Sequence, residues 1–400
     1  MTKPLSSPLP CRFPEGSGAP SRNAGRGPGG GGGGPGGGGR GRLRAALRAL
    51  AVVLVAGVAL ALGAAPPPAA AAPPVCAGHD LIARLPADQR ARLEAATRDV
   101  PFHRGLFWRA RRGDQQIILV GTYHFDDPRH DAIMTRLGPE IDRADALLVE
   151  AGPDEEARLS RAITEDPGLI MDPSGPTLPE RLAPGEWRRL ADALAARGLP
   201  AVVASRMRPW YVSMMLGISP CMVGQVREGA MAGGLDHRLI RRAEGAGVPV
   251  RALEPWDTVF GLFRDMTPEQ EIDMVRAALP AAEHADDYTA TLTEAYFAGE
   301  SWLIWEFGRL DALASSGLSA AEVDRQMQLA QDNLMDRRNR AWIQPLESAA
   351  AEAAGRGRGV VAGFGALHLP GRNGVLSLLQ QRGWTISPLD GGPTGEDGDE

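Results

Sequence analysis

Two histidines follow the same local pattern in the sequence. Each comes after an apolar run typical of a buried strand, and each is the last residue of a Gly-x-x-His segment, at 121–124 (GTYH) and 365–368 (GALH). A glycine at the end of a strand lets the chain turn where a Cβ atom would clash. We therefore predict that His124 and His368 lie at the carboxyl edge of an α/β sheet, where the active sites of such folds are found.

The Gly-x-x-His spacing by itself is weak evidence for a site. Glycine is so frequent in this chain that matches arise by chance, and a third one occurs at 234–237. His237 lies where the pattern predicts the start of a helix, which is typical of a surface or capping histidine. The preceding strands are what distinguish His124 and His368.

A carboxylate occupies a comparable position. Glu150 directly follows the apolar run 146–149, so parallel strands would bring it to the same sheet edge as the histidines. Two histidines and one carboxylate with open positions form the ligand set of many catalytic metal sites. The alternative is that Glu150 caps the next helix and that each histidine forms hydrogen bonds in the core. The spacing does not decide between them.

The elements that must position these residues alternate between strands and helices. The pattern predicts strands at 106–110, 116–120, 146–149, 201–203, 248–253, 359–363 and 384–387. It predicts helices at 88–98, 131–143, 178–197, 210–216, 235–244, 268–279, 288–297, 302–313, 320–353 and 374–382. We therefore expect an α/β (α+β) fold, in which a mixed sheet from the N- and C-terminal segments surrounds a large helical insertion.

The N-terminal part of the chain has the features of an export signal. Residues 1–48 are rich in Gly, Pro and Arg, and this composition predicts a disordered prefix. The uncharged run 49–65 and the Pro/Ala stretch up to 74 predict a signal peptide or a signal anchor. We expect a periplasmic or secreted protein, which the anchor would tether to the inner membrane, and an acidic, flexible tail at 390–400.

Charge and cysteine content narrow the possible functions further. The formal net charge of the chain is −6 although its prefix is basic, so the remainder is acidic, which argues against nucleic-acid binding. Three cysteines occur, and Cys11 lies in the predicted prefix. Cys76 and Cys221 remain, and an even pair in an exported chain favours a disulfide over two buried thiols.

Five segments carry a resemblance to a known family. They are 120–129 (VGTYHFDDPR), 147–155 (LLVEAGPDE), 234–254 (GLDHRLIRRAEGAGVPVRALE), 333–346 (NLMDRRNRAWIQPL) and 363–384 (GFGALHLPGRNGVLSLLQQRGW). The chain resembles the TraB/GumN family, which includes bacterial pheromone-shutdown proteins and the animal Tiki proteins. The resemblance spans 76–389, so we expect one domain there. It also resembles the secreted proteobacterial subset, in which one cysteine lies near the mature N-terminus and another follows a Ser-Pro; Cys76 and Cys221, after Ser219 and Pro220, fit this pattern.

The resemblance implies a fold related to erythromycin esterases, ChaN and Tiki proteins. Tiki proteins are described as metal-dependent proteases, and their site residues correspond to His124, Glu150 and His368. Arg338 and Asn339 of the RRN motif would stabilise charge at the site or orient its residues; alternatively, they pair with carboxylates inside a helix bundle. Asp236 and Glu254 also match family positions, where we expect a structural role.

These inferences predict a metal-dependent hydrolase that cleaves a peptide or amide bond. A divalent ion (Mn, Co or Zn) would be held by His124, Glu150 and His368, and the water bound to it would attack. Glu150 could instead act as the general base. The alternatives are a non-catalytic protein that binds a peptide or signal in the periplasm, and an esterase that works without metal. The expected partner is a peptide or small-molecule substrate, and a membrane would be contacted only through the N-terminal anchor.

Overall fold

The computed structural model of the protein describes residues 78–227, 233–264, 266–315 and 319–389. The predicted prefix 1–48, the predicted signal segment 49–74, Cys76 and the predicted tail 390–400 lie outside the described residues. Within the described part, no helix is both long and apolar enough to cross a membrane.

A six-stranded mixed sheet forms the core of the fold, in the order β4-β3-β5-β2-β1-β6. The strands are β1 (Phe107–Arg112), β2 (Gln115–Thr122), β3 (Leu147–Val149), β4 (Val250–Ala252), β5 (Val360–Gly365) and β6 (Thr385–Pro388). Strands β4, β3, β5 and β2 are parallel, whereas β1 is antiparallel to both β2 and β6. The predicted assembly of N- and C-terminal strands around an insertion is confirmed, and the insertion contributes the edge strand β4.

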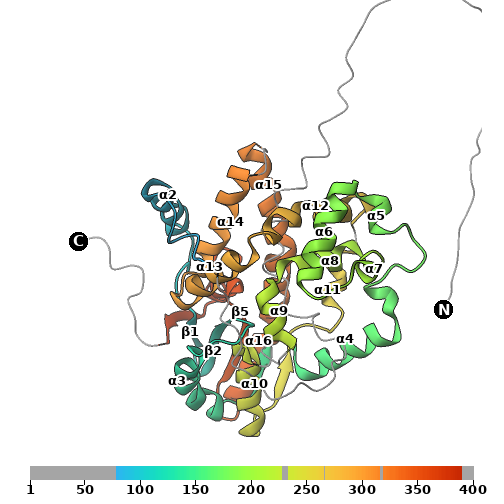
Figure 1. The fold of residues 1–400 in the computed structure, drawn as a ribbon. Helices are drawn as coiled ribbons and strands as arrows, with labels where there is room; N and C mark the ends of the chain where they lie inside the picture. The colour runs from blue at the N-terminus through green and yellow to red at the C-terminus, as the bar shows by residue number, and fades with distance from the viewer. Residues whose placement is uncertain (1–77, 228–232, 265, 316–318, 390–400) are drawn as a thin grey trace, which may run out of the picture. The chain divides into compact units, whose positions relative to one another are not determined.

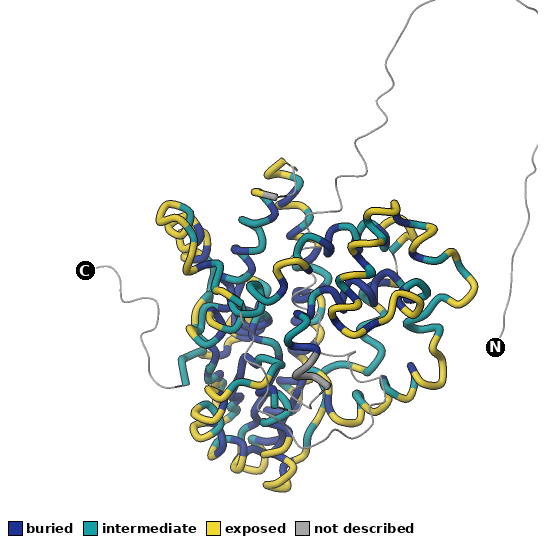
Figure 2. Tube along the Cα trace, in the orientation of Figure 1, coloured by how far each residue is buried: buried dark blue, intermediate teal, exposed yellow. Residues whose placement is uncertain are grey.

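Helices cover both faces of the sheet because its central strands are apolar on both sides. Along β2, Ile117 and Leu119 pack in a cluster with α16 (Arg337–Ala354) and α17 (Val375–Gln381). The alternating residues Ile118 and Val120 pack in a second cluster with α3 (His130–Arg143) and α10 (Leu235–Gly245). Successive side chains of a strand point to opposite faces, so β2 is buried from both sides, and Figure 2 shows this concentration of buried residues.

A carboxylate of α16 ties the antiparallel edge of the sheet to the C-terminal segment. Glu347 accepts hydrogen bonds from Arg112 Nη1 at 2.7 Å, Arg382 Nε at 2.8 Å and Trp384 Nε1 at 3.1 Å. The hydrogen bond from Arg382 is the main cause that lowers the pKa of Glu347 to about 2, even though partial burial acts in the opposite direction. Glu347 is therefore ionised at neutral pH and joins β1, α16 and the turn that precedes β6.

The insertion forms helical layers with apolar cores of their own. One core, around Leu190, Trp210 and Val275, is shared by α4 (Pro153–Glu165), α5 (Leu178–Arg181), α6 (Pro184–Ala196), α7 (Ala201–Ala204), α8 (Pro209–Gly217), α9 (Pro220–Arg227), α11 (Thr258–Gly261) and α12 (Pro268–Ala282). Figure 1 shows α5 to α8 grouped together, apart from α3 and α10.

The remaining helices are α2 (Ala87–Arg98), α13 (Ala285–Phe297), α14 (Ser301–Ser315) and α15 (Ala320–Gln331), and a π-helical turn (Asp332–Asp336) joins α15 to α16. Leu93 of α2 packs against Leu303 and Phe307 of α14. This contact attaches the segment that precedes β1 to the insertion.

Several predicted elements differ from the structure. The predicted strand 201–203 is wrong: these residues form the short helix α7, which begins directly after Pro200. The predicted helix 178–197 is two helices, because Leu182 and Ala183 are extended before Pro184 starts α6. Helices α4, α9 and α11 were not predicted. The helix predicted at 320–353 is present but contains the π-helical turn that ends just before α16.

Candidate functional site

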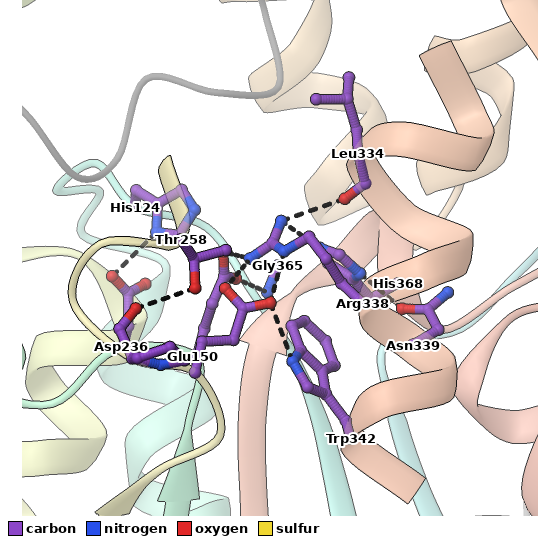
Figure 3. A network of polar contacts seen from close by, with 12 residues as sticks. His124, Glu150, Asp236, Thr258, Leu334, Arg338, Asn339, Trp342, Gly365 and His368 are labelled. Carbon is purple, nitrogen blue, oxygen red and sulfur yellow. Dashed lines mark hydrogen bonds and ion pairs between the residues drawn. The ribbon is translucent and has the colours of Figure 1, made fainter. Parts of the chain in front are cut away.

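The three residues singled out by their spacing meet at one edge of the sheet. His124 lies two residues after β2, Glu150 directly follows β3, and His368 ends a 3₁₀ turn after β5. A Cβ atom placed on Gly365 would lie 3.6 Å from His368 Cδ2, 3.8 Å from Glu150 Oε2 and 3.9 Å from His124 Nε2. The predicted convergence at the carboxyl ends of parallel strands is therefore found, with Gly365 at its centre (Figure 3).

The two glycines of the Gly-x-x-His segments have different roles. A Cβ atom on Gly121 would approach Leu369 Cδ1 to 2.8 Å and Ala366 Cα to 3.1 Å, so the segment after β5 packs directly on the β2 backbone. A Cβ atom on Gly365 would make ordinary van der Waals contacts, but it would fill the space among the three site residues. Gly121 is required for packing, whereas Gly365 keeps the site open.

His368 is held as a neutral imidazole with a defined tautomer. Its Nδ1 lies 2.6 Å from Asn339 Oδ1, and its Nε2 lies 3.3 Å from Nη1 of Arg338. A guanidinium group can only donate, so Nε2 accepts and the ring proton is on Nδ1, which donates to Asn339. Burial, followed by the charge of Arg338, lowers the pKa of His368 to about 3. Asn339 in turn donates to the carbonyl oxygen of Asn373 at 2.9 Å.

His124 is oriented by a carboxylate from the insertion. Its Nδ1 lies 2.9 Å from Asp236 Oδ2. Burial alone would lower the pKa of His124, but the charge of Asp236 and its hydrogen bond outweigh burial and raise the pKa to about 9. Asp236, for which we expected a structural role, is thus a direct partner of a site residue.

Arg338 joins the other members of the site through all of its donors. Its Nε donates to Glu254 Oε1 at 2.6 Å, and its Nη2 donates to Glu254 Oε2 at 2.8 Å and to Glu150 Oε1. Its Nη1 donates to the Leu334 carbonyl at 3.1 Å and contacts His368 Nε2. A guanidinium group has five N–H donors, and these contacts use all five. Arg338 therefore positions Glu150 and His368, and none of its donors is left for a ligand.

Glu150 is ionised because of this environment. Burial raises the pKa of a carboxyl group, but Arg338 and the two histidines more than offset burial and hold the pKa of Glu150 well below its usual range. Its Oε2 lies 3.4 Å from the Gly365 amide nitrogen, which donates to it. Both carboxylate oxygens are thus fixed by the protein.

Trp342 is a member of the site that the sequence analysis missed. Its Nε1 donates to Glu254 Oε1 at 3.0 Å, and its ring centroid lies 4.4 Å from that of His368. It follows Arg338 by four residues on α16, and residues with this spacing lie on the same face of a helix. This spacing is the signal that could have found it. Figure 3 shows Trp342 below Arg338 and His368.

A cavity of about 240 Å³ opens beside the site. His124, Glu150, Arg338 and His368 line it, together with apolar side chains from the insertion, whereas Asn339 lies behind His368 and is not among its lining residues. The site is therefore accessible to a small ligand, and the insertion contributes part of its walls.

Comparison with known proteins identifies the family. The sequence model of the TraB/PrgY/gumN family matches residues 106–388, which is more than half of the chain. The chain belongs to the TraB/PrgY/gumN family. This confirms the family resemblance, and the matched region contains all the proposed site residues. No curated protein and no solved structure matches the chain, so the resemblance to erythromycin esterases, ChaN and Tiki proteins in fold stays a prediction.

The metal and disulfide predictions for this TraB/PrgY/gumN protein stay predictions. Among the residues that the structure describes, no group of three or more His, Cys, Asp or Glu side chains is arranged to hold a metal ion. Cys221 lies in α9, whereas its predicted partner Cys76 lies outside the described residues.

Proposed function

We propose that this TraB/PrgY/gumN protein is an exported hydrolase of peptide or amide bonds that uses a divalent metal ion, Mn, Co or Zn, held by His124, Glu150 and His368. The observation that carries the proposal is the meeting of these three side chains around Gly365, on the wall of a cavity. The location follows from the predicted signal segment 49–74, and we propose that the protein acts in the periplasm or outside the cell.

The site offers donor atoms of the types that such an ion binds. Each imidazole directs its Nδ1 to an oxygen, of Asp236 or of Asn339, so Nε2 is the atom that would reach an ion. Proteins orient metal-binding histidines in this way. On His368 the ion would take the place of the Arg338 Nη1 donor at Nε2, and on His124 it would take the place of a proton. Glu150 adds an anionic carboxylate, the third ligand type common in catalytic sites. When bound, a divalent ion lowers the pKa of a water molecule and polarises a carbonyl group.

The residues of the chain itself set up the hydrolysis. Arg338 and the Gly365 amide fix the Glu150 carboxylate, and Arg338 also fixes His368, so both side chains are positioned before a ligand enters. Such preorganisation avoids the cost of ordering them during the reaction. Glu150 serves either as a ligand or as the base that takes a proton from the attacking water, because carboxylates act in both roles.

Metal content is the first test. Wild-type protein, the double variant His124→Ala/His368→Ala and the control His103→Ala are purified without chelator, loaded with Mn, Co or Zn, and measured by elemental analysis. His103 contacts the Val100 carbonyl and does not line the cavity, so it reports on non-specific loss. We expect wild type and the control to retain metal and the double variant to lose it. Equally poor retention of metal by all three proteins would refute the metal proposal.

Turnover is the second test. Glu150→Gln keeps the size of the side chain but removes its charge, so a hydrolase should still bind its ligand and lose turnover. Candidate substrates are supplied as a peptide library with each metal, and the products are read by mass spectrometry. A variant that retains the full biological effect without turnover would identify a peptide- or signal-binding protein instead. Ester hydrolysis that is insensitive to chelator would identify a metal-free esterase.

A further inference from the structure

The cavity beside the site has walls of two kinds. One part is the polar site itself. The other part is apolar and comes from the insertion, through side chains that include Leu159, Ile218, Met222, Val259, Leu262 and Ile304. The cavity volume is about 240 Å³. The space thus suits a group with a large apolar part, since apolar surface gains most from leaving water.

The charges around the cavity disfavour an anionic ligand. Arg338 is the only arginine or lysine among the described lining residues, and its five donors are all used within the protein. His124 is paired with Asp236. Two further carboxylates, Glu155 and Glu156 at the start of α4, also line the cavity. In the metal-free protein, a carboxylate on a ligand would therefore meet like charges without a free guanidinium to bind it.

Two residues that line the cavity have buried hydroxyl groups without a hydrogen-bond partner among the described residues. Thr122 at the end of β2 and Ser301 at the start of α14 are each 3% exposed, and both line the cavity. Within the described residues, neither Thr122 Oγ1 nor Ser301 Oγ has a hydrogen-bond partner. A buried polar atom without a partner is costly, and most such atoms in proteins are satisfied. Both oxygens are covered in the structure, so a ligand that carries a donor and an acceptor would satisfy both once the two side chains turn toward the cavity.

We propose that the cavity binds an uncharged amide that carries a bulky apolar side chain, and that the hydroxyl groups of Ser301 and Thr122 form hydrogen bonds with its amide group. The apolar side chain occupies the wall formed by the insertion, while the amide carbonyl faces His124, Glu150 and His368. Ser301 and Thr122 are thus specificity-determining residues. This assignment of substrate class rests on the proposed hydrolase function of the same site.

Binding of matched small probes tests the proposal without requiring turnover. The probes are N-acetyl-leucinamide, N-acetyl-leucine, which has the same size but ends in a carboxylate, and N-acetyl-glycinamide, which lacks the apolar side chain. Affinities are measured by ligand-observed NMR on the full chain without added metal. We expect N-acetyl-leucinamide to bind at least about tenfold more tightly than N-acetyl-glycinamide, because burial of a leucine side chain is worth this much or more. We expect it also to bind more tightly than N-acetyl-leucine, whose carboxylate would meet the carboxylates of the cavity. Equal affinity for N-acetyl-leucinamide and N-acetyl-leucine would overturn the inference that the cavity disfavours an anionic ligand.

Three variants test the residues. Ser301→Ala should weaken leucinamide binding by about two- to tenfold, since it removes one hydrogen bond. Ser377→Ala is the matched control, because Ser377 Oγ is also buried without a partner but does not line the cavity. Val259→Trp fills the apolar part and should abolish binding. If Ser301→Ala misfolds by circular dichroism, Ser301→Thr, which retains the hydroxyl, should restore both folding and binding. A Ser301→Ala protein that is folded and binds like Ser377→Ala would refute the assignment of Ser301.

Failure of this proposal is distinguishable from failure of the hydrolase proposal. Glu150→Gln should still discriminate leucinamide from glycinamide, because the apolar wall is unchanged. Selective binding without any turnover by wild type would leave the ligand class standing and remove the hydrolase function. Turnover of amides without discrimination among the probes would support the hydrolase function and refute the proposed ligand class.

Discussion

Replacing Arg338 by methionine removes the group that holds the site together. The side chain of Arg338 is 12% exposed, and those of its partners Glu150 and Glu254 are 26% and 11% exposed. Because these exposures are low, solvent would compensate poorly for the lost guanidinium. Breaking a buried ion pair by removing one partner typically costs 3–5 kcal/mol, since the remaining charge is left unpaired. We expect Arg338→Met to lower the free energy of unfolding by about 3–5 kcal/mol.

The triple variant Arg338→Met/Glu150→Gln/Glu254→Gln separates the effect of charge from that of packing. It leaves no unpaired carboxylate, and its glutamine at 254 can still accept the Trp342 hydrogen bond, so it should recover most of the lost stability. Unfolding in urea, followed by tryptophan fluorescence and circular dichroism, measures each free energy. The ion pairs of Arg338 with Glu150 and Glu254 do not carry the stability we assign to them in either of two cases. The first is a free energy of unfolding of Arg338→Met within about 1 kcal/mol of the wild-type value, and the second is a triple variant that is less stable than the single one.

Three further predictions concern the glycines of the Gly-x-x-His segments, Glu347 and the two cysteines. Gly365→Ala should have a free energy of unfolding within about 0.5 kcal/mol of the wild-type value, yet it should abolish metal uptake and turnover. Gly121→Ala should be clearly destabilised in urea, because its methyl group overlaps the segment after β5. Glu347→Gln should cost about 1 kcal/mol or less at neutral pH, since its arginine partners are partly exposed. The pKa of Glu347 is lower in the folded protein, so its carboxylate contributes to the free energy of unfolding above the usual pKa near 4.5. This contribution is lost as the pH falls towards 2. The stability difference between variant and wild type should therefore vanish over that range. Without reductant, alkylation followed by mass measurement should leave Cys76 and Cys221 unmodified, and two alkylated thiols would refute the disulfide.

The sequence pattern located the strands that form the sheet because it is local. An apolar run of four to six residues between turn signals is typical of a buried strand, and the runs before His124, Glu150 and His368 are β2, β3 and β5. The same pattern is ambiguous for very short runs, which is why residues 201–203 were predicted as a strand. Pro200 precedes this segment, and proline is equally compatible with the start of a helix.

The sequence by itself determined the family, the mixed α/β sheet and the three residues at its carboxyl edge. These depend on short segments, and parallel strands necessarily bring their ends to one edge. Only the tertiary structure decided how the residues are held. Asp236 lies 112 positions from His124, and Glu254 lies 84 positions from Arg338. Such contacts depend on how distant helices pack, and so does the cavity beside the site, to which the insertion contributes part of the walls. No local pattern of residues encodes that packing.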